Sequence, residues 1–416
     1  MLRILNGEVV IAGAARTPIA GLDGALAKYK APQLGGIAIK AALERSGVNP
    51  RDVDEVILGN VVSAGTGQSP AKQAAVAAGL PHSIMSMTVN TVCSAGMAAV
   101  IEGVRAILSG TSKVLAVGGM ESRSNAPYLL GPTDKKGSRV EGEVRGYVFT
   151  PAFPGPDAPV DDYKKFIRNL RMAGFKEANT FEALVCPFKD ATSMKDYAVK
   201  YAEKRGWTAD FINGFAAESY AKAERARDEG LFADEIVPVG DVKDDAIHPK
   251  ELQEHLRAKS DSVCSSYNAP SLGDGAAALV IAEAERARDL GLTPLARILG
   301  FSRVDVPPED FIASPATAAN MLIEGIAQSG GPSKFDILEG NESFGLQIPL
   351  FREAVPIEKL NVHGGAVALR HPLGAAGARI LVTLIHAMKR YGLENGVAAI
   401  CFASGGAYAI ALELAD

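Results

Sequence analysis

The chain has 416 residues, of which 43 are glycine, so about a tenth of it is glycine against a usual share of about 7%. Hydrophobic residues make up 47% and charged residues 22%, which excludes a disordered chain, a collagen and a coiled coil. The formal net charge of −5 argues against a nucleic-acid-binding protein. Apolar runs are too short for a membrane helix of about 18 residues, so we expect neither nucleic acid nor membrane as a partner.

Cysteines are few and widely spaced: Cys93, Cys186, Cys264 and Cys401. Without a C-x-x-C pair, this spacing favours neither a disulfide scaffold nor a zinc site, and we expect no metal. The first residues lack the charged and long apolar regions of a signal peptide. We therefore expect a cytoplasmic protein with free thiols.

The first third of the chain alternates between strand-like and helix-like segments. Apolar runs predict strands, and the segments between them have helical periodicity. Such alternation predicts βαβ units, an α/β protein and a mainly parallel sheet. The expected strands cover 9–15, 56–58, 87–92 and 113–117, and the expected helices cover 34–46, 71–78 and 94–108.

The same order of segments returns near the end of the chain. Residues 335–341 resemble 54–60, residues 360–389 resemble 89–108, and residues 397–406 resemble 114–119. Chance similarity is an alternative. However, three pairs of similar segments that occur in the same order favour two related α/β halves over a solenoid, whose repeats are much shorter.

A region of different composition separates the two halves. Residues 131–159 are rich in glycine, proline and charge, which predicts a functional loop or lid. A helix is expected at 161–173, and others at 193–205 and 209–229. The first carries a basic face that is either solvated or a contact for phosphates or an acidic partner: Lys164, Lys165, Arg168 and Arg171. We predict a first half at 1–120, an inserted covering region at 121–270 and a second half at 271–416.

Three residues at strand ends carry the chemistry. Cys93 opens a helix, whose N-terminus favours the thiolate, although a structural cysteine is an equally good interpretation of Cys93 alone. His371 also lies between a strand and a helix and could take the thiol proton, or it could be a capping histidine. Cys401 precedes a Gly/Ser turn whose N–H groups could bind an oxyanion.

Together, these segments resemble the thiolase family over nearly the whole chain. Six blocks carry the resemblance: RTP at 16–18, NTVCSAG at 90–96, GGMES at 118–122, DGAAA at 274–278, NESF at 341–344, and NVHGGA with HPLG at 361–366 and 371–374. Two departures stand out. Arg370 replaces the glycine that usually precedes His-Pro, and CFASGG at 401–406 replaces CxGGG. The inserted region is also remodelled, being longer between 121 and 194 and shorter between 241 and 274.

The resemblance implies a role for each of these residues. Cys93 would carry the acyl group, His371 would activate it, and Cys401 would exchange the α-proton of the second CoA ester. Asn341 would hold a water of one oxyanion hole, and the backbone N–H groups of Cys93 and Ala403 would form the other, provided that φ of Ala403 is negative. Coenzyme A would be a substrate, with no tightly bound cofactor.

The resemblance also implies a layered α/β/α/β/α fold of two pseudo-repeated halves with an inserted loop domain. It further implies homodimers or tetramers, with an accessory subunit as an open alternative. The residues expected to contact substrate are Met194, Ser193, Arg370, Phe344 and His363.

The acyl group is a separate hypothesis. Because Arg370 could pair with a carboxylate, a dicarboxylic or aromatic substrate of the 3-oxoadipyl-CoA or benzoylsuccinyl-CoA type is favoured. Arg370 could instead make an internal, CoA or subunit contact. The alternatives are an acetoacetyl-CoA or general fatty-acid 3-ketoacyl-CoA thiolase, and a catalytically weak acyl-CoA-binding subunit. A ketosynthase is a further rival, against which Cys401 and the NESF segment favour thiolase.

Overall fold

The computed structural model describes residues 1–130, 175–188 and 192–415. The expected loop at 131–159 and the basic helix at 161–173, with Lys164, Lys165, Arg168 and Arg171, lie outside the described residues. Among the described helices, none has the length and apolar character needed to cross a bilayer.

The first half is built on five principal strands. Four of them, β2, β6, β4 and β5, run in the same direction, and β9 runs against its two neighbours β2 and β6. In order across the sheet the strands are β2 (Val9–Arg16), β9 (Gly273–Glu283), β6 (Val114–Ser122), β4 (Glu55–Gly59) and β5 (Met85–Val89).

The second half repeats this order. Here β14 is the strand that runs against its neighbours. The strands are β10 (Ala296–Asp305), β14 (Gly406–Leu414), β13 (Asn395–Phe402), β11 (Ile337–Gly340) and β12 (Lys359–Leu360). A short antiparallel contact between β10 and β2 joins the two halves, and β1 (Leu2–Ile4) and β3 (Ala20–Gly21) extend the sheet at β10 and β9.

The expectation of a mainly parallel sheet is therefore only partly correct, because one strand in each half is reversed. A tight turn at 403–405 joins β13 to β14, and strands joined by a short turn must pair antiparallel. The composition of β9, rich in alanine and glycine, gave little strand signal in the sequence. The predicted correspondence of β4, β5 and β6 to β11, β12 and β13 is confirmed, because the order β6-β4-β5 in the first half of the sheet matches the order β13-β11-β12 in the second.

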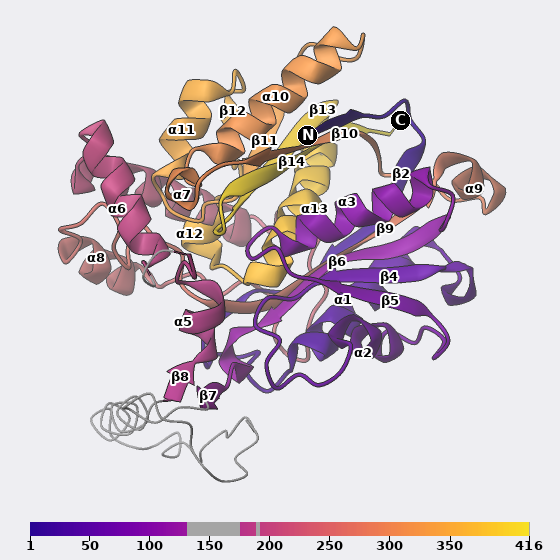
Figure 1. Ribbon diagram of the computed structural model, residues 1–416, viewed down its shortest axis with the longest axis horizontal. Helices are drawn as coiled ribbons and strands as arrows, with labels where there is room; N and C mark the ends of the chain where they lie inside the picture. The colour runs from indigo at the N-terminus through magenta and orange to yellow at the C-terminus, as the bar shows by residue number, and fades with distance from the viewer. Residues whose placement is uncertain (131–174, 189–191, 416) are drawn as a thin grey trace.

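Helices separate and cover the two halves, which confirms the layered α/β fold (Figure 1). In the middle layer, α3 (Ala95–Leu108) packs against α13 (Leu373–Tyr391), and α13 contacts strands of both halves. The outer layer of the first half contains α1 (Ala31–Ser46) and α2 (Pro70–Ala77). That of the second contains α10 (Ser314–Gln328) and α11 (Gln347–Ala354).

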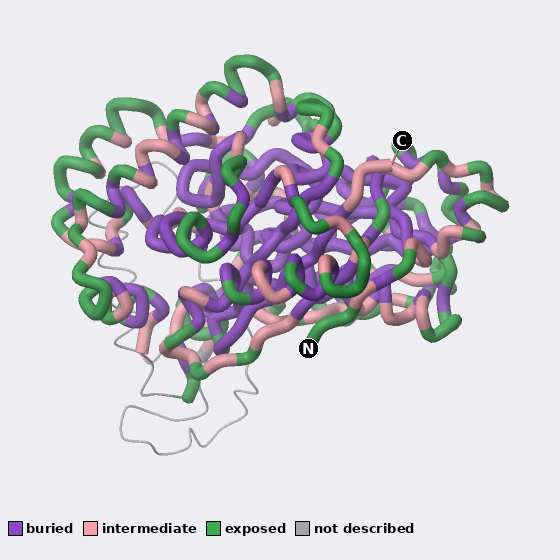
Figure 2. The backbone as a smooth tube through the Cα atoms, turned by 90° about the horizontal axis from the view of Figure 1, so that it is seen from above, coloured by how far each residue is buried: buried purple, intermediate pink, exposed green. Residues whose placement is uncertain are grey.

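Burial follows these layers. Buried segments run through the middle of the molecule, and exposed turns lie on the outer helices (Figure 2). The middle-layer helix α13 is buried almost continuously from Leu373 to Met388, as expected for a helix that contacts both halves. Its N-terminus lies so close to β6 that a Cβ on Gly119 would be 1.9 Å from the carbonyl oxygen of Gly374. Glycine at 119 is what allows this approach.

A separate group of elements lies at one end of the molecule (Figure 1). The short strands β7 (Tyr128–Leu130) and β8 (Phe175–Glu177) pair antiparallel, and β8 leads to α5 (Ala178–Ala183). This group also contains α6 (Met194–Arg205), α7 (Ala209–Asp228), α8 (Lys250–Ala258) and the four-residue α12 (Ala366–Leu369). The short helix α9 (Ala284–Asp289) lies on the opposite side of the molecule, beside β2 and β9 (Figure 1). The boundaries proposed for the three regions, 1–120, 121–270 and 271–416, stay predictions.

Candidate active site

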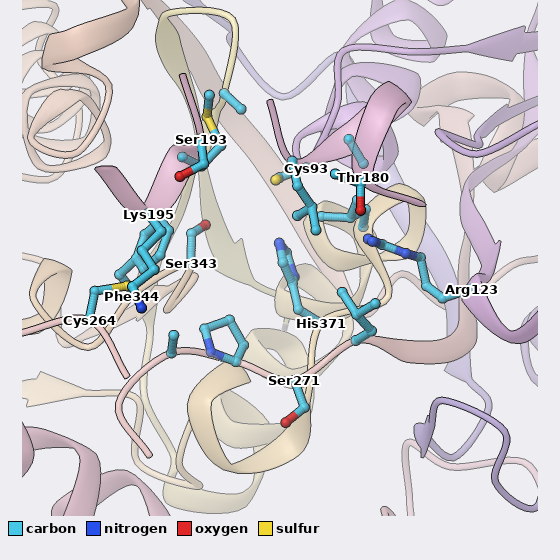
Figure 3. Close-up of a pocket in the computed structure, with 18 of the residues that line it drawn as sticks. Cys93, Arg123, Thr180, Ser193, Lys195, Cys264, Ser271, Ser343, Phe344 and His371 are labelled. Atoms are coloured by element: carbon cyan, nitrogen blue, oxygen red, sulfur yellow. The ribbon is translucent and has the colours of Figure 1, made fainter. Parts of the chain in front are cut away.

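A cavity of about 720 Å³ lies between this end group and the ends of the central strands (Figure 3). Cys93 follows β5 and so enters from the carboxyl side of a strand, where open α/β sheets bind ligands. His371, expected between a strand and a helix, lies instead between the helices α12 and α13. Seven residues predicted for the site line the cavity: Cys93, His371, Ala403, Ser193, Met194, Phe344 and Arg370.

The turn before Cys93 is strained. Val92 has φ of 55°, a left-handed conformation that β-branched residues rarely adopt. The amide of Val92 donates to Asn90 Oδ1 at 3.0 Å, and Asn90 Nδ2 donates to the carbonyl of Val61 at 3.2 Å. The Asn90 side chain therefore stabilises a turn that places the Cys93 side chain at the cavity.

Burial keeps the Cys93 thiol protonated. Its side chain is buried, and this desolvation, together with the proximity of Cys401, raises its pKa well above the usual value for a thiol. Arg123 acts in the opposite direction but is outweighed. The helix N-terminus, which was expected to favour the thiolate, is therefore outweighed by burial in the resting site. A base must remove the proton.

His371 is suited to be that base. Burial, reinforced by the charges of Arg123 and Arg379, lowers its pKa to about 3, so the imidazole is neutral at pH 7. Neither ring nitrogen has a hydrogen-bond partner among the described residues. Backbone contacts hold it: the His371 amide donates to the Ser271 carbonyl at 3.0 Å, and the nearby Gly374 amide donates to Glu121 at 2.9 Å.

The turn after Cys401 retains a backbone donor. Ala403 lines the cavity and is not among the described non-glycine residues with positive φ, which are Asp23, Ser69, Val92, Asn361 and Arg370. The left-handed positions of this turn fall on Gly405 and Gly406 instead. Alanine at 403 is therefore unstrained, which meets the condition under which its N–H can serve an oxyanion hole.

Asn341 and Cys401 lie behind a residue that the sequence analysis did not single out. Ser343 lines the cavity, accepts a hydrogen bond from Asn341 Nδ2 at 2.8 Å and lies 3.2 Å from Cys401 Sγ. Because the Ser343 hydroxyl accepts from Asn341, its own proton is available to Cys401. The signal was present in the sequence, since serine stands where the NEAF pattern has alanine.

Arg370 adopts a backbone conformation that suits glycine. Its φ of 72° and ψ of 176° fall in a region occupied almost only by glycine. Its Nε donates to the carbonyl of Ala246 at 2.6 Å, and one terminal nitrogen lies 3.2 Å from His248 Nδ1. The side chain lines the cavity, but two of its nitrogens already have protein contacts.

His363 does not line this cavity. Its Nε2 lies 3.2 Å from the Tyr391 hydroxyl, and its ring packs edge-on against Phe232. His363 therefore lies apart from the other four predicted substrate contacts, all of which line the cavity. Among the described residues, no group of three or more His, Cys, Asp or Glu side chains is arranged to hold a metal ion.

Two cationic side chains of the cavity were also missed. Arg123 follows β6 directly, and Lys195 is the second residue of α6; nothing in their local sequence distinguishes them from surface cations. Their position in the cavity arises only from the tertiary fold.

The described site can support acyl transfer. It combines a protonated thiol, a neutral imidazole, a backbone donor at Ala403 and a second thiol behind Ser343. A thiol and a neutral base can exchange a proton as a carbonyl is attacked, and the donors can stabilise the resulting oxyanion.

Comparison with known proteins agrees with this chemistry. Residues 9–285 match the family described as the thiolase N-terminal domain, and residues 292–414 match the thiolase C-terminal domain. The chain is 36% identical to an acetyl-CoA acetyltransferase of Schizosaccharomyces pombe, over 99% of this chain and 100% of that one. It is 37% identical to an acetyl-CoA acetyltransferase of Cupriavidus necator, over 98% and 99% of the two chains.

Solved structures give the same result. The acetyl-CoA acetyltransferase of Bacillus anthracis superposes with a TM-score of 0.83 at 31% identity, covering 98% of this chain and 99% of the other. A thiolase of Ascaris suum in complex with coenzyme A superposes with a TM-score of 0.82 at 33% identity, covering 98% and 100%.

Proposed function

Because this chain belongs to the thiolase family, we propose that it cleaves or forms a 3-oxoacyl-CoA through an acyl-enzyme on Cys93. Enzymes of this family are acyltransferases that use coenzyme A as a substrate rather than as a tightly bound cofactor. The observation that carries the proposal is the neutral His371, whose ring nitrogens have no hydrogen-bond partner in the described part of the chain, in the same cavity as the Cys93 thiol.

In the first half of the reaction, Cys93 Sγ attacks the 3-keto carbonyl as its proton moves to His371. The N–H groups of Cys93 and Ala403 would stabilise the oxyanion. The bond between C2 and C3 then breaks, and the leaving carbanion is delocalised into the thioester as an enolate. Splitting the transfer through an acyl-enzyme replaces one difficult step by two easier ones.

Cys401 would protonate the enolate carbon and complete the first product. Its pKa is raised by burial, which keeps the thiol protonated and able to act as an acid, while the contacts with Ser343 and Gln347 lower it. The imidazolium of His371 would return its proton to the Cys401 thiolate, which restores both groups. Coenzyme A then attacks the acyl-enzyme, His371 would accept the proton of its thiol, and that proton would pass to the departing Cys93 thiolate. In condensation the same steps run in reverse.

The acyl group is the finer part of the proposal. Relatives named acetyl-CoA acetyltransferase support a short substrate such as acetoacetyl-CoA. The contacts of Arg370 with Ala246 and His248 weaken the case for that residue as a carboxylate receptor. A second candidate, a larger or carboxylated acyl group, is favoured by the volume of the cavity and by its cationic lining.

The test is to supply acetoacetyl-CoA and CoA and to measure acetyl-CoA formation, with intact-protein mass spectrometry to detect an acyl group. We expect cleavage, and acylation that maps to Cys93. Cys93→Ala should abolish both, whereas Cys264→Ala, which removes another thiol of the cavity, should retain acylation. Undiminished cleavage by Cys93→Ala would refute the proposed mechanism.

We also infer that the chain assembles as a homodimer through β5. Among the described strands β5 pairs only with β4, so its other edge has no partner. Met85 and Met87 on this strand are 66% and 40% exposed. An exposed apolar edge strand is a template for pairing, and two copies related by a two-fold axis would cover it. Light scattering of a Met87→Lys variant should show a shift toward monomer; an unchanged mass would exclude this edge.

For the compartment, the cytoplasm remains our proposal. The four cysteines are free and buried, which fits a reducing compartment.

A further inference from the structure

The charges that line the active-site cavity are one-sided. Three cationic side chains, Arg123, Lys195 and Arg370, contribute to its described lining, and no Asp or Glu side chain does. Lys195 and Arg123 enter from opposite sides in Figure 3. Arg370 already contacts Ala246 and His248. Arg123 and Lys195 are therefore the cations to consider as binding sites for an anion.

Arg123 differs from the other two because it is fully buried. Its exposed fraction is 0%, and the described residue that hydrogen-bonds its side chain is Asn179, at the start of α5. Nε donates to Asn179 Oδ1 at 2.6 Å, Nη2 donates to the Asn179 carbonyl at 3.4 Å, and Asn179 Nδ2 donates back to the Arg123 carbonyl. Nη1 has no hydrogen-bond partner among the described residues.

The carboxylates nearest to Arg123 are committed elsewhere. Glu121 accepts from Asn60 and from the backbone of Val61, Val62 and Gly374. Asp274 accepts from the backbone and hydroxyl of Ser124, and Glu177 accepts from Thr180. Their charges favour the guanidinium at a distance, but none of these carboxylates hydrogen-bonds Nη1.

A buried cation without an ion pair is costly unless something compensates it. Here the unpartnered nitrogen belongs to a side chain that faces a cavity shared with Cys93, and its planar fork suits a carboxylate. Ala183 at the end of α5 and Leu184 directly after it add apolar lining that suits methylene groups, while Thr180 of α5 adds a hydroxyl. The site therefore offers an apolar wall beside an unpaired guanidinium.

We propose that Arg123 forms an anion subsite within the acyl pocket and binds the terminal carboxylate of an acyl group carried as its CoA thioester. This inference rests on the proposed thiolase activity and specifies its substrate class. The same anionic chemistry occurs in the phosphates of coenzyme A. Those phosphates are separated from the thioester by the pantetheine arm, whereas Arg123 lies close enough to Cys93 to act on its charge.

The test compares two thiolysis substrates of equal carbon number, 3-oxoadipyl-CoA with a terminal carboxylate and 3-oxohexanoyl-CoA with a terminal methyl group. Both carry the same CoA phosphates, so the ratio of their kcat/KM values reports the acyl end alone. In the wild type we expect this ratio to exceed one. In Arg123→Met we expect the ratio to fall about 10- to 100-fold, as for loss of a hydrogen bond to a charged group.

Two matched variants sharpen the test. Arg123→Lys keeps the charge without the fork and should lower the ratio less than Arg123→Met does. Lys195→Met removes another cation of the same cavity and should leave the ratio unchanged. If Arg123→Met lowers kcat/KM for both substrates equally, the residue serves Cys93 or the CoA phosphates, and the subsite is refuted. A ratio that responds to Lys195→Met alone also refutes it.

A wild-type measurement does not depend on how the variants fold. Succinyl-CoA should inhibit acetoacetyl-CoA thiolysis more strongly than butyryl-CoA, which has the same chain length without the carboxylate; equal inhibition would overturn the inference. Failure of the wild type to cleave any 3-oxoacyl-CoA, with no acyl group on Cys93, would instead refute the thiolase proposal.

Discussion

The turns that present Cys93 and His371 use the same backbone device in opposite halves of the molecule. Each residue follows a non-glycine residue of positive φ, Val92 at 55° and Arg370 at 72°, and each is followed by a middle-layer helix. Such conformations cost about 1–3 kcal/mol and persist only where surrounding contacts impose them. Strain at both turns therefore accompanies the placement of both side chains at the cavity.

The pKa shifts of the residues that the two turns present, Cys93 and His371, are opposite in direction. Burial disfavours the charged form of any group, so it raises the pKa of the Cys93 thiol and lowers that of the His371 imidazole. One turn thus supplies a proton donor and the other an unprotonated acceptor. The comparison teaches that one physical cause, desolvation, prepares both partners, and that neither needs to be charged before substrate arrives.

The largest expected effect comes from removing the acceptor. His371→Asn should lower kcat/KM for thiolysis by about 10³-fold, within the range for loss of a general base. Steady-state assays with acetoacetyl-CoA measure this. His386→Gln, which replaces a half-buried histidine on α13, serves as a control and should change kcat/KM little. A His371→Asn enzyme close to wild type would break the assignment of the two turns as donor and acceptor.

A smaller effect concerns the resting thiol. Because the folded pKa of Cys93 lies above the usual value of about 9, the thiolate fraction is small at pH 7 and rises about tenfold for each pH unit below the pKa. The rate of Cys93 alkylation by iodoacetamide should therefore still be rising at pH 9. Peptide mapping separates Cys93 from Cys264, which shares the cavity. A plateau below pH 8 would mean that the thiolate is stabilised in the resting site.

The smallest effect concerns strain at the second turn. Arg370→Gly and Arg370→Ala both remove the contacts with Ala246 and His248, but only glycine accepts φ of 72° and ψ of 176° without strain. We expect Arg370→Gly to be more stable than Arg370→Ala by about 1 kcal/mol, because relief of strain exceeds the entropic cost of glycine. Urea denaturation measures the difference. Equal midpoints would show that the turn relaxes when the side chain is lost.

Much of the site could be predicted from the sequence. Cys93 and Cys401 each lie where an apolar strand gives way to glycine and small residues, and that pattern is local. His371 stands in the HPLG motif, although the segment before it is the helix α12 and not a strand. The six motif blocks added the family, the layered fold and CoA as a substrate. The repeat of β4, β5 and β6 was also readable, because strand patterns depend on neighbouring residues.

Other features could not be predicted because they depend on what surrounds a residue rather than on what precedes it. The reversed direction of β9 is set by its pairing with β2 and β6, which are distant in the chain, and Arg370 makes its contacts with residues more than 100 positions earlier. The direction of the Cys93 pKa shift contradicted the local expectation from the helix N-terminus. Desolvation depends on every layer packed around the thiol, whereas the effect of a helix end falls off within one turn.

The sequence by itself therefore determined the family and predicted the residues that carry its chemistry, since both follow from short segments of fixed composition. Only the tertiary structure decided the direction of the pKa shifts of Cys93 and His371, the contact of Ser343 with Cys401, and the burial of Arg123 without an ion pair among the described residues. Charge and hydrogen bonding in a cavity are set by residues that meet from distant parts of the chain, and their energies depend on the water that folding excludes.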